Sequence, residues 1–301
     1  MKALLISCFV AFAAISYSNA QKAITIEEKN LSFKHGTING FIVSIPEVPL
    51  KTVEEKWISS IQKGTKSKVQ KEYGEMTIFG AIIKDVAGGP INIYSYIKQK
   101  DSIVYLAASF ELKKDEYINS ETRDYEASKA KSYLFQFAKD NYLDLAKNQL
   151  QTEEKKLNKL ESNLNSLQNE KNKLEKTILS DTSEIIATKS ELKSSGQNLQ
   201  SLNDELKAQK NQVDTMSAGP AKEEKTKYIA DLEKRINKTK TSISSGEKKL
   251  VELQSEIKQA QNEGIPKNNL EQEKVKKEII AKKEVVRIMT NKYNTIKAFT
   301  M

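Results

Sequence analysis

A seven-residue apolar repeat between Leu143 and Met216 is the feature that most limits what this chain can fold into. The repeat has two series of eleven positions, of which ten are apolar in the first and six in the second. The first series is Leu143, Leu150, Leu157, Leu164, Lys171, Ile178, Ile185, Leu192, Leu199, Leu206 and Val213, and the second is Ala146, Glu153, Leu160, Leu167, Leu174, Asp181, Thr188, Ser195, Leu202, Gln209 and Met216. A heptad pattern kept this long without slippage specifies a left-handed coiled coil, because it holds one stripe of the helix against a partner helix. At ~1.5 Å per residue, it predicts a helix of about 110 Å.

The rest of the chain predicts that the partner helix is its own C-terminal part. Gly219-Pro220 ends the first arm, because Gly suits the position after a helix and Pro the first turn of the next one. The turn lies 76 residues after Leu143 and 80 residues before Phe299, so the return arm is long enough to run back beside the first. Its heptad positions are Ile229, Leu232, Ile236, Ile243, Leu250, Leu253, Ile257 and Ala260, and then Val275, Ile279, Val286, Met289, Tyr293 and Ile296. The small residues around Gly196 and Gly246 are expected to face each other.

Residues 21–118 predict a small α+β domain with one helix and an antiparallel sheet. Residues 23–26 and 31–33 are expected to form a short first strand or a hairpin. Further strands are expected over 41–45, 76–86, 91–98 and 103–112, with a helix over 52–63. Short connections favour an antiparallel meander for the last three strands. Trp57 is expected in the core. The stripe of Ala130, Leu134, Phe137, Ala138 and Leu145 is expected to dock the long helix onto the sheet.

The predicted order of segments is therefore a signal peptide, a globular domain and a helical hairpin. The boundaries are 1–20 for the signal peptide, 21–118 for the α+β domain, 119–217 for the first arm with a cap at Asn119 or Ser120, 218–220 for the turn, 221–263 for the return arm, 264–269 for a break and 270–299 for the last helix.

The first twenty residues have the pattern of a cleaved export signal. Lys2 precedes an apolar run from Ala3 to Ile15, and small residues end at Ala20, after which cleavage is expected. Cys8 lies in a segment similar to a lipoprotein box, so lipid attachment there is the alternative. Cleavage would remove the only cysteine and leave a chain without disulfides. The expected location is the periplasm or another part of the cell envelope.

Charge is mildly basic overall, with 49 Lys and Arg against 40 Asp and Glu. Residues 267–301 concentrate the excess, with 9 basic and 4 acidic residues. Six basic residues of this segment could contact a partner, or they could simply form a solvated helix face. They are Lys274, Lys276, Lys277, Lys282, Lys283 and Arg287. A peripheral contact with acidic lipid is the functional alternative for this helix. Nucleic acid is not expected as a partner, because the charge is dispersed and no reading motif is present.

Tyr94, Tyr96 and Tyr105 alternate with the apolar residues of their strands and are expected on the opposite sheet face. They either line a binding surface or pack against a helix or the base of the coil, and packing is the simpler interpretation.

Groups typical of catalysis or metal binding are hard to find. His35 is the only histidine, and no serine is flanked by glycines as in a nucleophile elbow. A metal site would need a second histidine or a cysteine, and no glycine-rich phosphate loop precedes a helix. We therefore expect no enzyme activity, no metal and no cofactor.

In outline, the chain resembles the exported hairpin proteins of the bacterial envelope, namely the basic-armed Skp/OmpH-type chaperones and the adaptors with long helical hairpins. The separate α+β domain departs from the chaperones, and the C-terminal place of the hairpin departs from the adaptors. The sequence thus predicts a non-enzymatic scaffold or bridging protein for an envelope partner. The alternative is a holdase chaperone for unfolded exported clients, which would require a homo-oligomer with several hairpins around a cavity.

Overall fold

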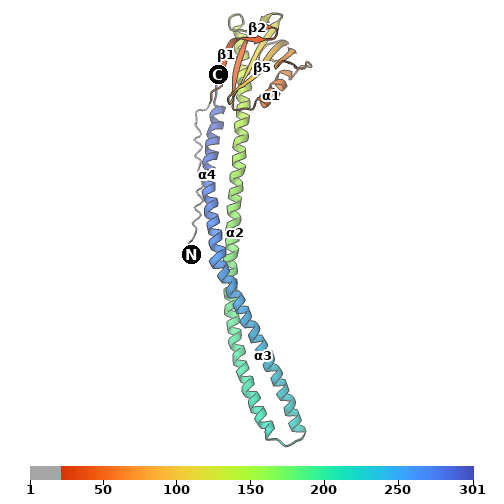
Figure 1. Cartoon of the computed structure of the whole chain (residues 1–301), viewed down its shortest axis with the longest axis vertical. Coiled ribbons are helices and arrows are strands. Elements are labelled where there is room, and N and C mark those ends of the chain that lie inside the picture. Colours follow the sequence, from red (N-terminus) through yellow and green to blue (C-terminus); the bar gives the residue numbers. More distant parts are fainter. Residues whose placement is uncertain (1–21) are drawn as a thin grey trace, which may run out of the picture. The chain divides into compact units, whose positions relative to one another are not determined.

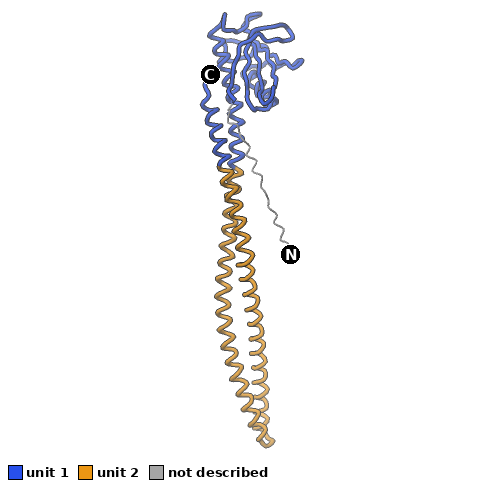
Figure 2. The backbone as a smooth tube through the Cα atoms, turned by 60° about the vertical axis from the view of Figure 1, so that its left-hand side comes forward, with its two compact units in different colours: residues 1–154, 284–301 blue, residues 155–283 orange. Residues whose placement is uncertain are grey.

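The computed structural model describes residues 22–301, so the predicted signal peptide and Cys8 lie outside the described residues. Two compact units divide the chain (Figure 2). One unit contains the chain up to Glu154 together with Glu284–Met301, and we call it the globular unit. The other contains Lys155–Lys283, and we call it the hairpin unit.

Seven antiparallel strands form one sheet in the globular unit (Figure 1). The strands are β1 (Ile26–Phe33), β2 (Gly36–Pro46), β3 (Gln70–Glu72), β4 (Glu75–Ala81), β5 (Ile91–Lys100), β6 (Ile103–Lys113) and β7 (Glu116–Tyr117). Their order is β1-β2-β6-β5-β4-β3, with β7 paired to β6. The predicted meander of the last three long strands is confirmed, and the fold class is α+β as expected.

Two strand predictions need correction. A single strand, β1, replaces the predicted short segments at 23–26 and 31–33, and it forms a hairpin with β2. The strand predicted to reach residue 86 ends at Ala81, and Val86 instead closes a turn with Ile83. The register of β4 is irregular before Ala81, and Gly80 has a φ of 70° there, a conformation that glycine adopts without strain. This bulge ends the strand early.

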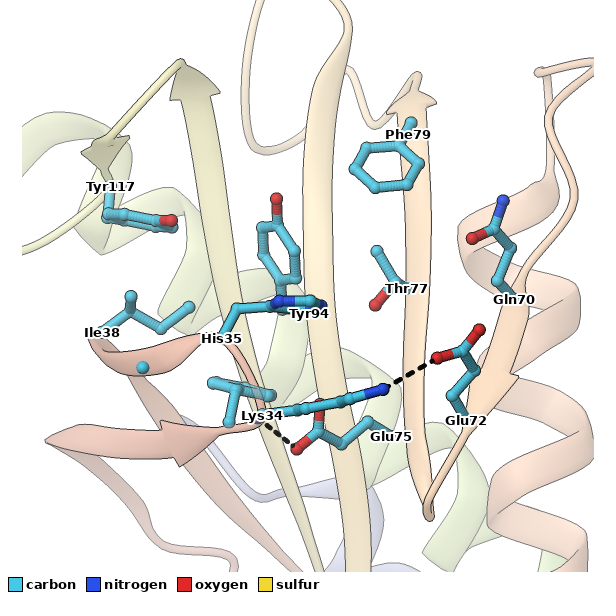
Figure 3. Close-up of a pocket in the computed structure, with 12 residues that line it drawn as sticks. Lys34, His35, Ile38, Gln70, Glu72, Glu75, Thr77, Phe79, Tyr94 and Tyr117 are labelled. Carbon is cyan, nitrogen blue, oxygen red and sulfur yellow. Dashed lines mark hydrogen bonds and ion pairs between the residues drawn. The ribbon is translucent and has the colours of Figure 1, made fainter.

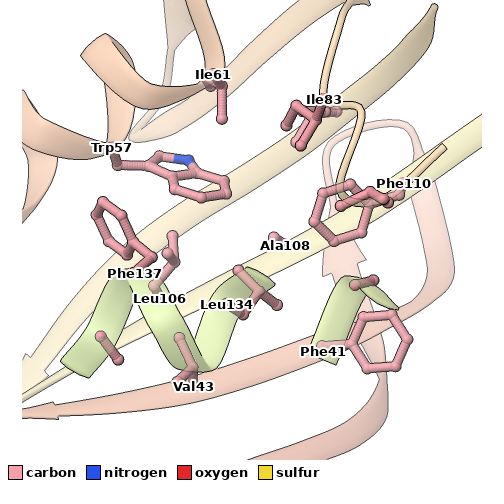
Figure 4. Close-up of a cluster of buried hydrophobic side chains, with 14 of the residues drawn as sticks. Phe41, Val43, Trp57, Ile61, Ile83, Leu106, Ala108, Phe110, Leu134 and Phe137 are labelled. Carbon is pink, nitrogen blue, oxygen red and sulfur yellow. The ribbon is translucent and has the colours of Figure 1, made fainter. Parts of the chain in front are cut away.

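Helices cover one face of the sheet. Helix α1 (Leu50–Gln62) buries Val53, Trp57 and Ile61, and the first turns of α2 (Asp124–Asp214) bury Leu134 and Phe137 in the same core (Figure 4). Trp57 donates its ring N–H to the Ser95 hydroxyl at 2.9 Å, so the buried indole keeps a polar partner. The predicted core position of Trp57 and the docking stripe of the long helix are both confirmed.

The long helix begins later than predicted. Asn119 accepts the backbone N–H groups of Glu121 and Thr122 and so caps a turn that precedes α2, while the Ser120 hydroxyl donates to Glu28. Both predicted caps are therefore used before the helix, which starts at Asp124.

The C-terminal end of the chain is fixed to the globular unit. Ile296 is fully buried in the large core, and Lys139 donates to the backbone carbonyl of Phe299 at 2.8 Å. Glu47 accepts a hydrogen bond from Tyr142 at 2.9 Å and pairs with Lys292 at 2.5 Å. These contacts join the end of α4 (Ile265–Lys297), the start of α2 and the loop after β2.

Within the hairpin unit, α2 runs antiparallel to α3 (Pro220–Gln259), as ion pairs between them show. Lys210 pairs with Glu233 at 2.7 Å and Lys249 with Glu184 at 2.5 Å. Every heptad position of this unit predicted above is buried or partly buried. The predicted coiled-coil seam is therefore confirmed, and it closes within one chain.

The glycine pairing across the hairpin is only partly as expected. A Cβ atom on Gly246 would lie 2.9 Å from the Leu192 side chain, whereas one on Gly196 would meet nothing within 4 Å. Gly246 therefore faces the seam and Gly196 faces solvent.

The predicted break at 264–269 is a continuous helix instead. Residues Ala260–Gly264 form a π-helical turn that runs directly into α4. A π turn accommodates one extra residue, so Pro266 fits without ending the helix. Asn268 then turns into the seam and donates to the Leu167 carbonyl at 3.0 Å. The helix continues because its seam stays packed on both sides of the turn.

Candidate functional site

The sheet face opposite the helices carries the predicted tyrosines. On β5, Tyr94 and Tyr96 alternate with the core residues Ile93 and Ser95, and Tyr105 pairs in register with Lys98 on the same face. The face itself was therefore correctly predicted. The favoured interpretation, that these rings pack against a helix, is wrong for Tyr94 and Tyr96, because their ring neighbours come from other strands.

The turn between β1 and β2 reaches across this face to β4. The backbone N–H of Lys34 donates to Glu75 at 2.8 Å, and the Lys34 ammonium pairs with Glu72 at 3.4 Å (Figure 3). The same ammonium lies 4.3 Å from the ring centre of Tyr73. Because β1 and β4 are not neighbours in the sheet, these contacts require a strongly curved sheet. The curvature encloses a cleft, which we call the aromatic cleft.

Four aromatic rings form the walls of the aromatic cleft. Tyr94 lies in the middle, 6.2 Å from Phe33, 6.3 Å from Phe79 and 6.3 Å from Tyr117, all with tilted or edge-to-face geometry (Figure 3). The cleft has a volume of about 470 Å³. Its lining consists of Phe33, Lys34, His35, Gly36, Ile38, Gln70, Glu72, Glu75, Thr77, Phe79, Tyr94 and Tyr117. Such a volume is in the range of small-molecule sites.

A buried carboxylate is hydrogen-bonded to the hydroxyl of the central ring. Glu111 is 5% exposed and accepts hydrogen bonds from Tyr94 at 3.1 Å, from Asn92 at 2.7 Å and from the backbone N–H of Asp115 at 3.0 Å. Burial opposes its ionisation, but these hydrogen bonds outweigh burial and lower the pKa of Glu111. Glu111 is therefore an ionised group that contacts the cleft through the Tyr94 hydroxyl.

Both cleft tyrosines are held in the neutral form. Burial, followed by the hydrogen bond to Glu111 and its charge, raises the pKa of Tyr94 to about 12. Burial and the charges of Glu111 and Asp115 also raise the pKa of Tyr117. The carboxylates thus create a negative field at both hydroxyl groups.

The sequence predicted only part of this site. Tyr94 lines the cleft. Tyr96, whose ring centre is 5.4 Å from that of Phe33, and Tyr105 are on the same sheet face but do not line it. Phe33, Phe79 and Tyr117 were missed. The alternation of β4 and the proximity of His35 to a turn were the available signals, but neither indicates that the sheet curves over itself.

The predicted basic residues of the last helix are placed among acidic partners. Lys274 pairs with Glu271 and Lys276 with Glu273, at 3.4 and 2.8 Å. Lys283 pairs with Glu161 across the hairpin at 3.1 Å. Arg287, in the globular unit, donates two hydrogen bonds to Glu284. Neighbouring carboxylates therefore compensate much of the positive charge of the last helix. Lys277 and Lys282, the other two predicted residues, lie on the same helix.

Groups that could perform catalysis are sparse in the described part of the chain. Among residues 22–301, no cluster of three histidine, cysteine or acidic side chains is arranged to hold a metal ion. His35 lines the aromatic cleft, and within residues 22–301 its side chain has no hydrogen-bond partner. Across the same residues, no helix is long and apolar enough to cross a bilayer.

Comparison with known proteins adds no identification. The chain matches no protein-family model, and no curated protein sequence is significantly similar to it.

Proposed function

We propose that this protein is a non-enzymatic scaffold or adaptor of the bacterial cell envelope, whose coiled-coil hairpin extends to a protein partner. The observation that carries this proposal is the closure of the hairpin seam within one chain. Leu192 packs at Gly246, and Lys210 and Lys249 pair across the two helices. Because each arm buries the apolar seam of the other, the hairpin needs no second chain to be stable and is suited to act as a spacer.

Placement in the envelope rests on the sequence. The N-terminal segment has a basic start, an apolar middle and small residues before Ala20, as in exported proteins. Its removal would give a mature chain that starts at Gln21. The proposed partner is accordingly another envelope protein, and the basic last helix remains a second candidate contact, including one with acidic lipid.

A holdase chaperone is the second candidate function, and one observation favours it. The arms expose large apolar side chains, among them Leu179, Ile186 and Val251, at 66–68% of their surface. Exposed apolar groups between charged ones suit the binding of unfolded clients. A chaperone of this kind would also assemble several hairpins around a cavity.

Site-specific photo-crosslinking in living cells separates the two functions. One probe replaces Gln212, which is exposed near the end of α2, and the other replaces Tyr73, which is 86% exposed at the rim of the aromatic cleft. An adaptor gives one recurring partner from at least one probe. A ladder of many exported proteins, together with an oligomer in light scattering, would favour the chaperone and contradict the adaptor.

Probes along the outward side of the arm are the matched control. Ser162 and Lys189 are exposed on the same helix as Gln212 but lie away from its end. An adaptor that binds at the end of the hairpin gives weak crosslinks at both positions. Equal crosslinking at all three positions would argue for binding along the whole arm.

A further inference from the structure

Four aromatic rings line the same cleft. Phe33, Phe79 and Tyr117 lie around Tyr94 with centroid distances of 6.2 to 6.3 Å and interplanar angles of 57 to 86°, and all four rings line the cleft. A ring face attracts a cation within about 6 Å through its quadrupole. From these rings and the carboxylates of Glu72 and Glu75 in the same lining, we propose that the aromatic cleft binds an organic cation through its ammonium group.

Charge around the cleft favours a cation over an anion. Glu72 and Glu75 line it, Glu111 accepts a hydrogen bond from the Tyr94 hydroxyl, and Lys34 is the only lysine or arginine of the lining. Burial is the main cause of the raised pKa values of Tyr94 and Tyr117, and the charges of Glu111 and Asp115 add to it. An anionic ligand would meet repulsion from three carboxylates, whereas a cation would gain from them.

At the rim of the cleft, Lys34 makes the same two contacts that we propose for the ligand, one with an aromatic ring and one with a carboxylate. The Lys34 ammonium lies 4.3 Å from the Tyr73 ring centre and 3.4 Å from a Glu72 oxygen. This is the combination of ring and carboxylate that an incoming ammonium would find farther inside. The side chains of Lys34 and Glu72 are both about half or more exposed, so the salt bridge between them is weak. A ligand can therefore enter past this pair without a large cost.

The cleft also has neutral polar groups for the rest of the ligand. The side chains of Gln70, Thr77 and His35 line it, and within residues 22–301 they have no hydrogen-bond partner. The volume of about 470 Å³ exceeds that of an ammonium group alone. The ligand is therefore expected to combine an ammonium head with a short polar body. A small quaternary amine and a lysine side chain of a protein partner both have this chemistry.

Calorimetric titration of the purified chain with choline tests the proposal. The matched probe is 3,3-dimethylbutan-1-ol, which has the same shape as choline but no charge. A cation–π site should bind choline at least about tenfold more tightly than the neutral compound. Equal affinity for the two compounds, or no binding of any ammonium probe at millimolar concentration, would overturn the proposal.

Variants of one wall residue connect the binding to the ring. Tyr117→Leu removes the aromatic face and should weaken choline binding by about three- to tenfold, whereas Tyr117→Phe keeps it and should bind like the parent. Tyr125→Leu is the control, because Tyr125 is 72% exposed on α2 and does not line the aromatic cleft. Circular dichroism confirms that each variant is folded. Loss of binding in Tyr125→Leu, or none in Tyr117→Leu, would contradict the assignment.

A second titration distinguishes the source of the ammonium group. Nα-acetyl-lysine methylamide carries a primary ammonium as a peptide does. Tighter binding of choline supports a small quaternary amine as ligand, and tighter binding of the lysine derivative supports a lysine of a partner. Because no partner protein is present in either titration, a negative result leaves the proposed hairpin function untouched.

Discussion

Replacing Asp181 with leucine should stabilise the hairpin unit. Asp181 lies at a heptad position of the seam, is only 8% exposed, and its Oδ2 atom has no hydrogen-bond partner among the described residues. A buried polar group without a partner costs ~1–3 kcal/mol. A buried leucine side chain contributes ~1.5–3 kcal/mol. The two contributions add up to ~2.5–6 kcal/mol, so we expect the free energy of unfolding to rise by at least about 2.5 kcal/mol.

Urea unfolding followed by circular dichroism at 222 nm measures this gain. The midpoint should move to higher urea while the slope stays unchanged, because the surface exposed on unfolding is nearly the same. A rise in Tm of ~5–15 °C should accompany it. Light scattering checks that the added leucine has not changed the oligomeric state.

An exposed aspartate on the same helix provides the control. Asp204 is exposed, so Asp204→Leu should change the free energy of unfolding by no more than ~0.5 kcal/mol. A midpoint for Asp181→Leu at or below that of the parent would refute the reasoning. It would mean that the carboxylate has a stabilising partner in solution.

Three further predictions concern packing, backbone and charge. Leu232→Ala should cost ~2–5 kcal/mol in urea unfolding because Leu232 is fully buried, whereas Ile280→Ala, at a 70% exposed position, should cost under ~0.5 kcal/mol; equal costs would contradict the seam. Gly196→Ala should stabilise the helix by ~0.5–1 kcal/mol, because nothing lies within 4 Å of the added Cβ. Gly246→Ala should stabilise it less, because its Cβ would lie 2.9 Å from the Leu192 side chain. A larger gain for Gly246→Ala would contradict the structure, in which Gly246 faces the seam and Gly196 faces solvent. Because the pKa of Tyr94 is raised from 10.0 to about 12, its contribution to stability is complete below pH 10 and is lost as pH rises toward 12. Tyr94→Phe should therefore lose less stability than the parent between pH 9 and 11.5, and equal losses would argue against this role.

The hairpin could be predicted from sequence because its apolar residues recur at a regular spacing. The heptad positions of both arms and the Gly219-Pro220 turn fix which surfaces meet, and each choice depends on residues only a few positions apart. Asp181 was visible as a polar residue within the seam for the same reason. The docking face of α2 was likewise readable from the spacing of Ala130, Leu134 and Phe137.

The aromatic cleft could not be predicted in the same way. Its closure depends on Lys34 reaching Glu72 and Glu75, which are 38 and 41 residues away in the sequence. Those contacts follow from the twist and curvature of the whole sheet, a property that strand alternation does not encode. Alternation therefore placed Tyr94 on the correct face but did not indicate that Phe33 and Phe79 would close around it.

Local sequence signals predict a break in the return helix, whereas the helix is continuous. Gly264 and Pro266 are both unfavourable inside a helix, so a break was expected. Packing of the seam on both sides, together with the hydrogen bond from Asn268 to Leu167, keeps the helix intact. Tertiary contacts thus outweighed intrinsic propensity.

The π-helical turn at Ala260–Gly264 limits which insertions and deletions the two arms can accept. It adds one residue to the return arm, and one residue corresponds to a rotation of about 100° around a helix axis. Deleting any single residue there would turn one side of the arm away from its partner. Insertions and deletions elsewhere are tolerated only as whole heptads, made in both arms at the same level. In homologous hairpins, we therefore expect arm lengths to differ by matched multiples of seven residues.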